Sequence, residues 1–331
     1  MKTTDVTALG EILIDFTENG ISDQGNPLLE VNPGGAPCNV LAMLRKFKRK
    51  TAFIGKVGDD NFGRFLSQRV ADLGIETSTL YIDQNVHTTL AFIHTDKNGD
   101  RDFSFCRNPG ADMMLNESEV DEELIKSSKI FHFGTLSMTH EPSRSATLKA
   151  LAIAKANNCI ISFDPNIREP LWDSLTETRR QVEVGLAYCD ILKISDNEIQ
   201  WFTGEMDFSK GVSKIREEYN IPLILVSMGN EGSCAYYQDL VVQVEAFLNN
   251  QTIETTGAGD TFCGCVLNYV LEWGLSDLSD EQLTEMLRFA NAAASLITTR
   301  KGALCSMFET EEIKAFMNGV VTHSQYSPPF I

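Results

Sequence analysis

Short apolar stretches alternate with longer amphipathic stretches along most of the chain, and this pattern limits the fold more than any other feature. Strand-like runs occupy residues 6–14, 51–57, 129–134, 159–163, 190–194 and 222–227. Helix-like runs occupy residues 38–46, 61–74, 142–157, 261–271 and 280–299. Strands that alternate with helices predict βαβ units, and therefore an α/β fold in which helices cover a mostly parallel sheet. Ligands of such folds bind at the carboxyl ends of the strands.

Two segments interrupt the alternation, at about residues 12–33 and 86–107. In the second, an apolar run over 88–93 leads to Asn98-Gly99, and residues 101–105 return. Asn-Gly between two such runs is typical of a β-hairpin. We expect one domain over residues 1–331, in which both segments form a small β lid over the site. Two ordinary surface hairpins are the alternative interpretation.

Charge and cysteine content restrict the partners and the compartment. Lys and Arg total 28 against 46 Asp and Glu, so the formal net charge is -18. An acidic surface repels phosphate backbones and anionic membranes, so we expect neither a nucleic-acid nor a membrane partner. The 8 cysteines include no C-x-x-C pair, no run of about 18 apolar residues occurs, and no secretory signal is visible. These features predict reduced thiols and a cytoplasmic protein.

The clearest chemical motif is Gly257-Ala258-Gly259-Asp260, directly before a helix-like run. The glycines permit a tight turn that exposes backbone N–H groups, and the start of a helix attracts anions. A carboxylate there suits a base that faces a hydroxyl nucleophile while the N–H groups hold a transferring phosphoryl group. Asp260 as a simple helix N-cap is the alternative.

A second motif, Gly34-Gly35 followed by Asn39, opens an earlier helix. The glycine pair lets a ligand approach the backbone, and the Asn39 amide both donates and accepts hydrogen bonds, which suits a polyol. Asp15 is expected at the end of the first strand, facing the crevice, where it would accept from sugar hydroxyls. A plain loop and a solvated aspartate are the alternatives.

On the lid hairpin, Phe103, Phe105 and Arg107 alternate, so we expect them to share one face. Two aromatic rings and a cation on that face would cover a sugar and a phosphate. A packed strand face is the alternative for the two rings.

Further polar groups follow three of the predicted strands, where an α/β site is expected. Residues 164–168 end at Arg168, and residues 193–198 begin with Lys193, which would meet a phosphate. Glu198 would orient the water shell of Mg²⁺, an ion that keeps several waters in proteins. Residues 227–232 contain Gly229 and Gly232, as in a nucleotide-phosphate loop. Solvated surface residues and an ordinary turn are the alternatives.

Taken together and in this order, the motifs resemble those of the PfkB-type (ribokinase-like) carbohydrate kinases, and most closely the bacterial fructokinases. The resemblance runs from Asp15 to about Ser306. It rests on residues 34–39, 53–63, 107–112, 164–168 and 256–260. The family's fold is a central sheet flanked by helices, with a small β lid that often forms a homodimer.

The resemblance implies a role for each matching residue. Asp260 corresponds to the catalytic base, and the N–H groups of Gly257, Ala258 and Gly259 to the anion hole. The sugar-side positions it implies are Asp15, Gly34, Gly35, Asn39, Phe105, Arg107 and Arg168. The ATP-side positions are Lys193, Ser195, Glu198, Ser227, Gly229, Gly232, Gly257, Gly259 and Asn291.

The metal sites depart from the common family pattern. Many members carry Asn-x-x-Glu near Mg²⁺, where this chain has Ser195 and Glu198. Many members that bind K⁺ have an aspartate where this chain has Glu254, whose side chain is longer. The K⁺ ligands that the resemblance implies are Glu254, Thr256, Ile297, Arg300, Gly302 and Ser306.

We therefore predict an ATP- and Mg²⁺-dependent sugar kinase that transfers the γ-phosphoryl group to a hydroxymethyl oxygen, with fructose as the sugar. Kinases of 2-keto-3-deoxygluconate, aminoimidazole riboside, ribose or a nucleoside remain as alternatives. A catalytically silent sugar-sensing homologue is the alternative outside the enzyme class.

Overall fold

The computed structural model describes residues 2–95 and 101–319. It contains a nine-stranded central sheet in the order β13-β12-β11-β10-β9-β8-β1-β4-β5, in which all neighbours are parallel except β11 with β12 and β12 with β13. The strands are β1 (Thr4–Leu9), β4 (Thr51–Gly58), β5 (Leu80–Asp83), β8 (Ser128–Phe133), β9 (Ile160–Phe163), β10 (Ile191–Ser195), β11 (Leu223–Ser227), β12 (Ser233–Tyr237) and β13 (Leu240–Val244). The mostly parallel sheet that the alternation predicted is confirmed.

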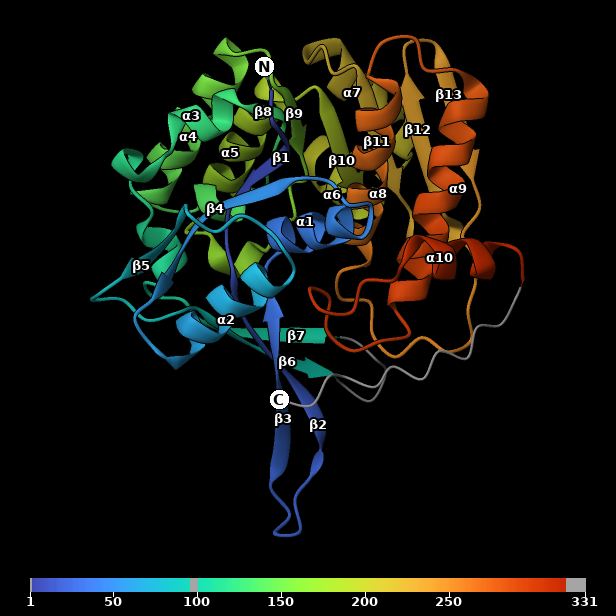
Figure 1. Ribbon diagram of the computed structural model, residues 1–331. Coiled ribbons are helices and arrows are strands. Elements are labelled where there is room, and N and C mark those ends of the chain that lie inside the picture. The colour runs from blue at the N-terminus through green and yellow to red at the C-terminus, as the bar shows by residue number, and fades with distance from the viewer. Residues whose placement is uncertain (1, 96–100, 320–331) are drawn as a thin grey trace.

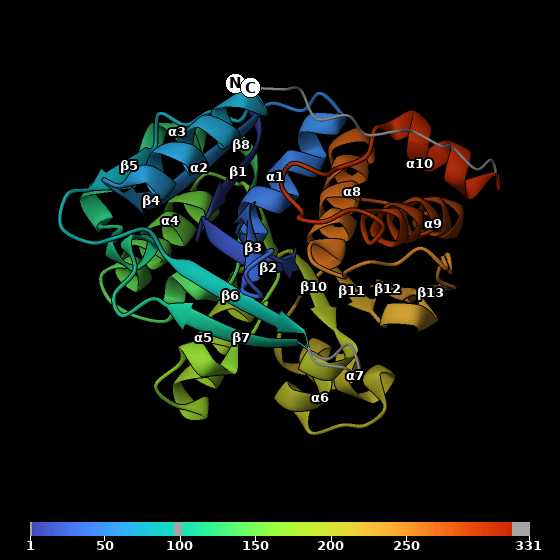
Figure 2. The same cartoon turned by 90° about the horizontal axis from the view of Figure 1, so that it is seen from below.

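Helices cover both faces of this sheet, as Figure 1 and Figure 2 show. One face packs against α1 (Ala36–Lys46), α2 (Asn61–Asp72), α8 (Ala258–Trp273), α9 (Asp280–Ile297) and α10 (Thr310–Met317). The other packs against α3 (Glu122–Lys126), α4 (Ser143–Ala156), α5 (Leu175–Tyr188), α6 (Asp196–Thr203) and α7 (Phe208–Glu218). The sheet thus separates two apolar cores, and its inner strands are buried on both sides, whereas the outer strands β5 and β13 are partly exposed.

A second sheet of four strands, hereafter the lid sheet, follows the order β3-β2-β6-β7. Its strands are β2 (Leu13–Ile21), β3 (Pro27–Gly34), β6 (Leu90–Thr95) and β7 (Arg101–Cys106). The predicted segments 12–33 and 86–107 supply all of them, and Figure 1 shows β2 and β3 extending away from the body of the molecule. The turn at Asn98-Gly99 lies outside the described residues, while the antiparallel pairing of β6 with β7 is as predicted.

The expectation of one strand over residues 6–14 is wrong. β1 ends at Leu9, and the chain passes through Gly10 and Ile12 into β2, which pairs with β3 and β6 of the lid sheet. Both sides of this break are apolar and buried, so hydrophobic periodicity gives no sign of it. Asp15 consequently lies within a lid strand, opposite Asn32, and not at the end of a central strand.

Helices α1 and α8 approach each other closely at Gly264. A Cβ atom at this position would lie 2.8 Å from Met43 Cβ and 3.0 Å from the Val40 carbonyl oxygen. Contacts this short leave no room for a side chain, so glycine sets the distance between the helices. The same two helices carry Asn39 and Asp260 in their first turns.

We expect Gly264→Val to lower the free energy of unfolding by about 1–3 kcal/mol, because the added methyl groups force α1 and α8 apart. Urea unfolding followed by circular dichroism measures the change. Ser213→Val, at an exposed position of α7, is the control for the cost of a β-branched residue in a helix. Equal losses in the two variants would contradict close packing as the cause.

Candidate active site

A cavity of about 430 Å³ lies between the lid sheet and the ends of α1 and α8. Of the predicted site residues, nine line it: Asp15, Gly35, Asn39, Phe105, Arg168, Thr256, Gly257, Gly259 and Asp260. Seven other residues complete the lining: Glu11, Leu13, Ala36, Ile93, Leu136, Asn166 and Thr255. The cavity thus joins segments from the start, middle and end of the chain, with strands of the lid sheet along one side.

Asp260 lies in the first turn of α8 and is buried, with 8% of its surface exposed. Its Oδ2 accepts a hydrogen bond from Asn39 Nδ2 at 2.8 Å, and its Oδ1 accepts one from Asn166 Nδ2 at 3.5 Å. Burial raises the pKa of Asp260, while the Asn39 hydrogen bond, the Lys193 charge and the Arg168 charge act to lower it. A buried carboxylate fixed in this way is suited to accept a proton.

The turn before α8 has the geometry expected of an anion site. Gly257 adopts a left-handed conformation with φ 77°, which favours glycine, and Gly257 and Gly259 both line the cavity. The first N–H groups of a helix lack intrahelical acceptors and point along the positive end of its dipole. Ala258 differs from the other two, because its N–H donates to the Thr255 carbonyl oxygen at 3.3 Å.

The start of α1 forms the facing wall. Gly35 has φ 123°, and a Cβ there would lie 2.5 Å from the Glu11 carbonyl oxygen, so only glycine fits. The Glu11 side chain accepts a hydrogen bond from the Ala36 N–H at 2.9 Å and thereby caps the helix. Asn39 presents its Oδ1 as a buried atom that has no hydrogen-bond partner among the described residues.

Glu11 is a lining residue that the sequence analysis did not identify, because a single charge inside an apolar run gives no sign of a site. It is only 4% exposed, and burial raises the pKa of its carboxyl group to about 7. The one signal in the sequence was Gly34-Gly35 before α1. Glycine has no side chain to accept from the first N–H groups of a helix, so another residue must provide the cap.

Gly34 does not line the cavity, but it lies next to Asp15, which does. A side chain at Gly34 would collide with Asp15 Oδ2, so this glycine leaves room for the carboxylate that lines the cavity. Phe105 and Arg168 also line it. Arg168 donates to its own neighbours, the Ile167 carbonyl oxygen at 3.2 Å and Asn166 Oδ1 at 3.3 Å.

Arg107 does not share a cavity-facing side with Phe105, because β7 ends at Cys106. Its side chain is 1% exposed and forms an ion pair of 2.8 Å with Asp112. The alternation expected across residues 103–107 assumed that the strand continues, and the chain leaves the sheet one residue earlier. The side chain of Phe103 lies outside the described residues.

Lys193 is buried in the middle of β10 and forms an ion pair of 3.0 Å with Asp164, which follows β9. A Cβ on Gly259 would lie 2.9 Å from Lys193 Nζ, so the ammonium group is adjacent to the turn before α8. Burial acts to lower the pKa of Lys193, but Asp164, Glu198 and Asp260 together raise it above its usual range. The amine therefore remains a cation next to the turn before α8.

Ser195 and Glu198 form the N-terminal cap of α6. Glu198 Oε2 accepts hydrogen bonds from the Ser195 N–H and Ser195 Oγ, both at 3.0 Å. Glu198 Oε1 accepts one from the Ile167 N–H at 2.9 Å. Within the described part of the chain, Oε1 accepts this one hydrogen bond only, so its second lone pair can still accept a hydrogen bond from a metal-bound water. The described residues contain no cluster of three or more His, Cys, Asp or Glu that would hold a metal by protein ligands alone.

The remaining predicted nucleotide-side residues lie near β11 and α9. Ser227 ends β11, and the following turn needs glycine because Gly229 has φ 54° and Gly232 has φ 100°. Asn291 on α9 ties the adjacent strands together: it accepts from Ser233 Oγ at 2.8 Å and donates to the Val244 and Glu245 carbonyl oxygens at 3.1 Å.

The predicted monovalent-cation residues surround the loop after α9. Glu254 Oε1 accepts a hydrogen bond from the Gly302 N–H at 2.7 Å, and Ser306 Oγ donates to the Lys301 carbonyl oxygen at 2.7 Å. The Ile253 and Glu254 N–H groups both donate to the Thr298 carbonyl oxygen. Glu254 thus stabilises the loop through both its side chain and its backbone N–H group.

Comparison with known proteins identifies the family of the chain. The model of the pfkB family carbohydrate kinases matches residues 3–310. The chain belongs to this family. Probable fructokinase-2 of Arabidopsis thaliana is 38% identical over 94% of the chain and 95% of its own length.

Two solved structures share the fold. The fructokinase of Xylella fastidiosa with bound ATP has a TM-score of 0.87 and 27% identity, covering 96% of this chain and 99% of its own. A double mutant of the fructokinase of Vibrio cholerae O395, bound to fructose, ADP and a potassium ion, has a TM-score of 0.85 and 28% identity, with coverage of 96% and 99%. The ribokinase-like expectation for the fold is therefore confirmed. Among the described residues, no helix has the length and apolar character that crossing a membrane requires.

Glu11 gives this kinase a testable pH dependence. Its pKa rises from 4.5 to about 7 on folding, so the folded chain loses stability as the pH increases through this range. Glutamine keeps an oxygen for the Ala36 N–H and does not ionise. We expect Glu11→Gln to be more stable than wild type by up to about 3 kcal/mol at pH 8 and nearly equal to it at pH 4.5.

Urea unfolding of both proteins at the two pH values measures this difference. Asp164, whose pKa burial also raises to about 7, is present in both proteins and cancels in the comparison. A stability difference that does not change with pH would contradict the assignment to Glu11.

Proposed function

We propose that this kinase transfers the γ-phosphoryl group of ATP to a hydroxymethyl oxygen of fructose. The observation that carries the proposal is the position of Asp260, whose carboxylate is held by Asn39 at the bottom of the cavity, beside Gly257 and Gly259. A base and an anion-binding turn at one point are what phosphoryl transfer to an alcohol requires. The names of the relatives and of the solved structures support fructose as the acceptor.

In the proposed reaction, Asp260 accepts the proton of the attacking hydroxyl group as the oxygen approaches the γ-phosphorus. The raised pKa of Asp260 suits this step, since a more basic carboxylate takes the proton more readily. The N–H groups of Gly257 and Gly259 hold the equatorial oxygens, and the helix dipole of α8 favours their negative charge. Lys193, adjacent to the same turn, adds a fixed cation.

The sugar side of the cavity supplies acceptors for a neutral polyol. Asn39 Oδ1 is buried and needs a donor, which a sugar hydroxyl provides. Asp15 and Glu11 line the same cavity and accept from further hydroxyl groups. Phe105 covers the sugar from the lid sheet, Gly34 leaves room for the Asp15 carboxylate, and Gly35 lines the cavity.

The same carboxyl groups favour fructose over the acid 2-keto-3-deoxygluconate. Glu11, Asp15 and Asp260 all line the cavity, where Arg168 is the cation among the lining residues. A carboxylate substrate would add a further negative charge to this set, and like charges in a buried site repel strongly.

ATP would occupy the side of Lys193, Ser195, Glu198, Ser227, Gly229, Gly232 and Asn291. Mg²⁺ bound with ATP would neutralise phosphate charge, and Glu198 would hold one of the water molecules bound to the ion. K⁺ would lie at the loop of Glu254, Thr256, Ile297, Arg300, Gly302 and Ser306, where it supports the backbone that leads into α8. The K⁺ ion of the Vibrio cholerae structure supports this choice of ion. One kinase domain over residues 1–331 and a cytoplasmic location complete the proposal.

The lid sheet also carries our proposal of a homodimer. Four large apolar side chains of β2 and β3 are exposed: Ile21, Leu28, Leu29 and Val31. β3 and β7 are the outer strands of the lid sheet, and unpaired strand edges with exposed apolar residues favour association. A second copy of this chain would cover both features at once.

We expect wild-type protein with Mg·ATP to phosphorylate fructose and to be much slower with 2-keto-3-deoxygluconate, ribose, aminoimidazole riboside and glucose. A coupled ADP-release assay, run with K⁺ and with Na⁺, measures this. Asp260→Asn should lower kcat by about 10²–10⁴, the usual contribution of a positioned base. No turnover of any sugar despite ATP binding would favour the silent sensor, and unchanged kcat in Asp260→Asn would remove that residue from the role of base.

We expect wild type to sediment as a dimer at micromolar concentration and Leu29→Lys/Val31→Lys to sediment as a monomer, because two charges in an apolar interface oppose association. Analytical ultracentrifugation distinguishes the two. Val241→Lys, an exposed position on β13, is the control and should remain dimeric. A monomeric wild type would contradict the dimer.

A further inference from the structure

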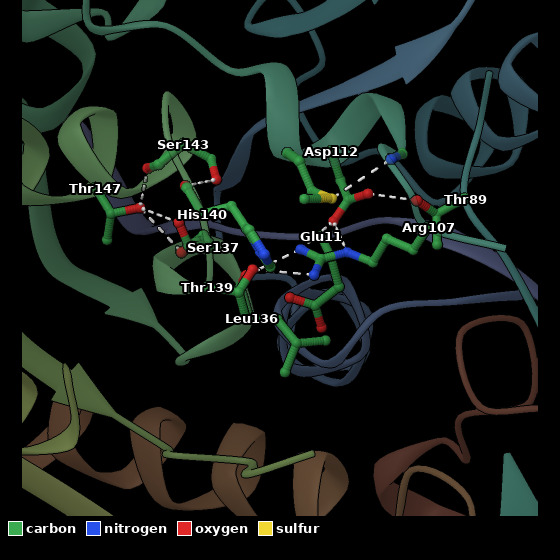
Figure 3. A network of polar contacts seen from close by, with 12 residues as sticks. Glu11, Thr89, Arg107, Asp112, Leu136, Ser137, Thr139, His140, Ser143 and Thr147 are labelled. Atoms are coloured by element: carbon green, nitrogen blue, oxygen red, sulfur yellow. Dashed lines mark hydrogen bonds and ion pairs between the residues drawn. The ribbon is translucent and has the colours of Figure 1, made fainter. Parts of the chain in front are cut away.

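Arg107 and Asp112 form a buried ion pair beside the cavity but outside its lining (Figure 3). Both side chains are 1% exposed. Asp112 Oδ2 accepts from Arg107 Nε and pairs with Arg107 Nη2, each at 2.8 Å. Burying both charges costs desolvation free energy that can cancel the attraction between them. A gain in stability therefore does not by itself explain why the pair is present.

The pair connects segments that are distant in the sequence. Arg107 follows β7 of the lid sheet, and Asp112 belongs to the short 3₁₀ helix η1 (Ala111–Met114). Asp112 Oδ1 accepts from Thr89 Oγ1 at 2.5 Å, just before β6. The pair therefore holds the base of both strands of the lid hairpin.

On its other side, Arg107 reaches the wall of the cavity. Its Nη2 donates to the Leu136 carbonyl oxygen at 2.9 Å and its Nη1 to Thr139 Oγ1 at 3.0 Å. Leu136 begins the 3₁₀ helix η3 (Leu136–Met138) and lines the cavity. Figure 3 shows Glu11, another lining residue, beside Arg107 and Leu136. One guanidinium group thus joins the lid base to the fixed wall of the sugar site.

We propose that the Arg107–Asp112 pair is a positioning unit, which sets the distance between the lid sheet and the Leu136 wall without contacting the substrate. The measurement of KM that tests this proposal requires the sugar kinase activity proposed above. The planar guanidinium group suits this role because it donates in several fixed directions at once, which a lysine does not.

We expect Arg107→Met and Asp112→Asn to raise KM for fructose about tenfold, since a displaced lid sheet weakens the contacts that hold the sugar. Neither residue touches the reacting atoms or the nucleotide side, so kcat and KM for ATP should remain within about threefold. Both variants should also lose stability, because each leaves a buried charge without its partner.

The double variant Arg107→Met/Asp112→Asn separates positioning from stability. It carries no unpaired charge, so its thermal unfolding temperature should return toward wild type, while KM for fructose stays high because the link to Leu136 is absent. Arg107→Lys should rescue KM only in part. Recovery of KM together with stability in the double variant would overturn the proposal.

Lys56→Met is the matched control. Lys56 is also buried, with 7% of its side chain exposed, and pairs with Glu119 at 2.9 Å, but neither residue lines the cavity. We expect a comparable loss of stability with KM for fructose unchanged. An equal increase of KM in this control would show that any lost ion pair loosens the site.

Hydrogen exchange tests the positioning even if no sugar is phosphorylated, in which case the proposed function alone fails. Amides of residues 90–93, 104–106 and 136–138 should exchange faster in Arg107→Met and in the double variant than in Lys56→Met. Equal exchange in all these variants would overturn the positioning role.

Discussion

The hydrogen bond from Asn39 to Asp260 is the contact on which the site depends. Burial alone would favour the protonated form of Asp260, which is of no use as a base. The Asn39 amide donates to the carboxylate and so favours the ionised form. This bond forms only because α1 and α8 start at the same place, and the glycine contact at Gly264 brings the two helices that close.

Several carboxyl groups around the cavity are kept in surroundings that oppose their ionisation. Burial raises the pKa of Glu11 and of Asp164 to about 7, far from the range of solvated acids. Such groups reduce stability at neutral pH, and they persist where a site needs polar groups in a dry environment. Glu11 accepts from a backbone N–H, and Asp164 holds Lys193, so each carboxylate orients a neighbour that the cavity or its adjacent turn uses.

Six of the nine strands of the central sheet, all but β5, β12 and β13, could be predicted from the sequence because they are short, apolar and separated by helices. The break after Leu9 could not, since both sides of it are equally apolar and only pairing with other strands distinguishes them. The motif Gly257-Ala258-Gly259-Asp260 was visible because its four residues are consecutive in the sequence. Glu11 and the contacts of Arg107 were not, because their partners lie far along the chain or in a different element.

The net charge of -18 sets a final constraint on how a polyanion such as ATP binds here. Charges beyond about 8–10 Å are largely screened at physiological salt, so the groups next to the phosphates decide. Lys193 is the cation at the anion-binding turn, and Asp164, Glu198 and Asp260 all act on it. The Lys193 ammonium group and the Arg168 charge, which acts on Asp260, face these three carboxyl groups, so little positive excess is left for the phosphates. If the proposed function holds, the affinity for ATP must come from backbone N–H groups and from a divalent cation that binds together with ATP. Mg²⁺ would then contribute to ATP binding as well as to the reaction.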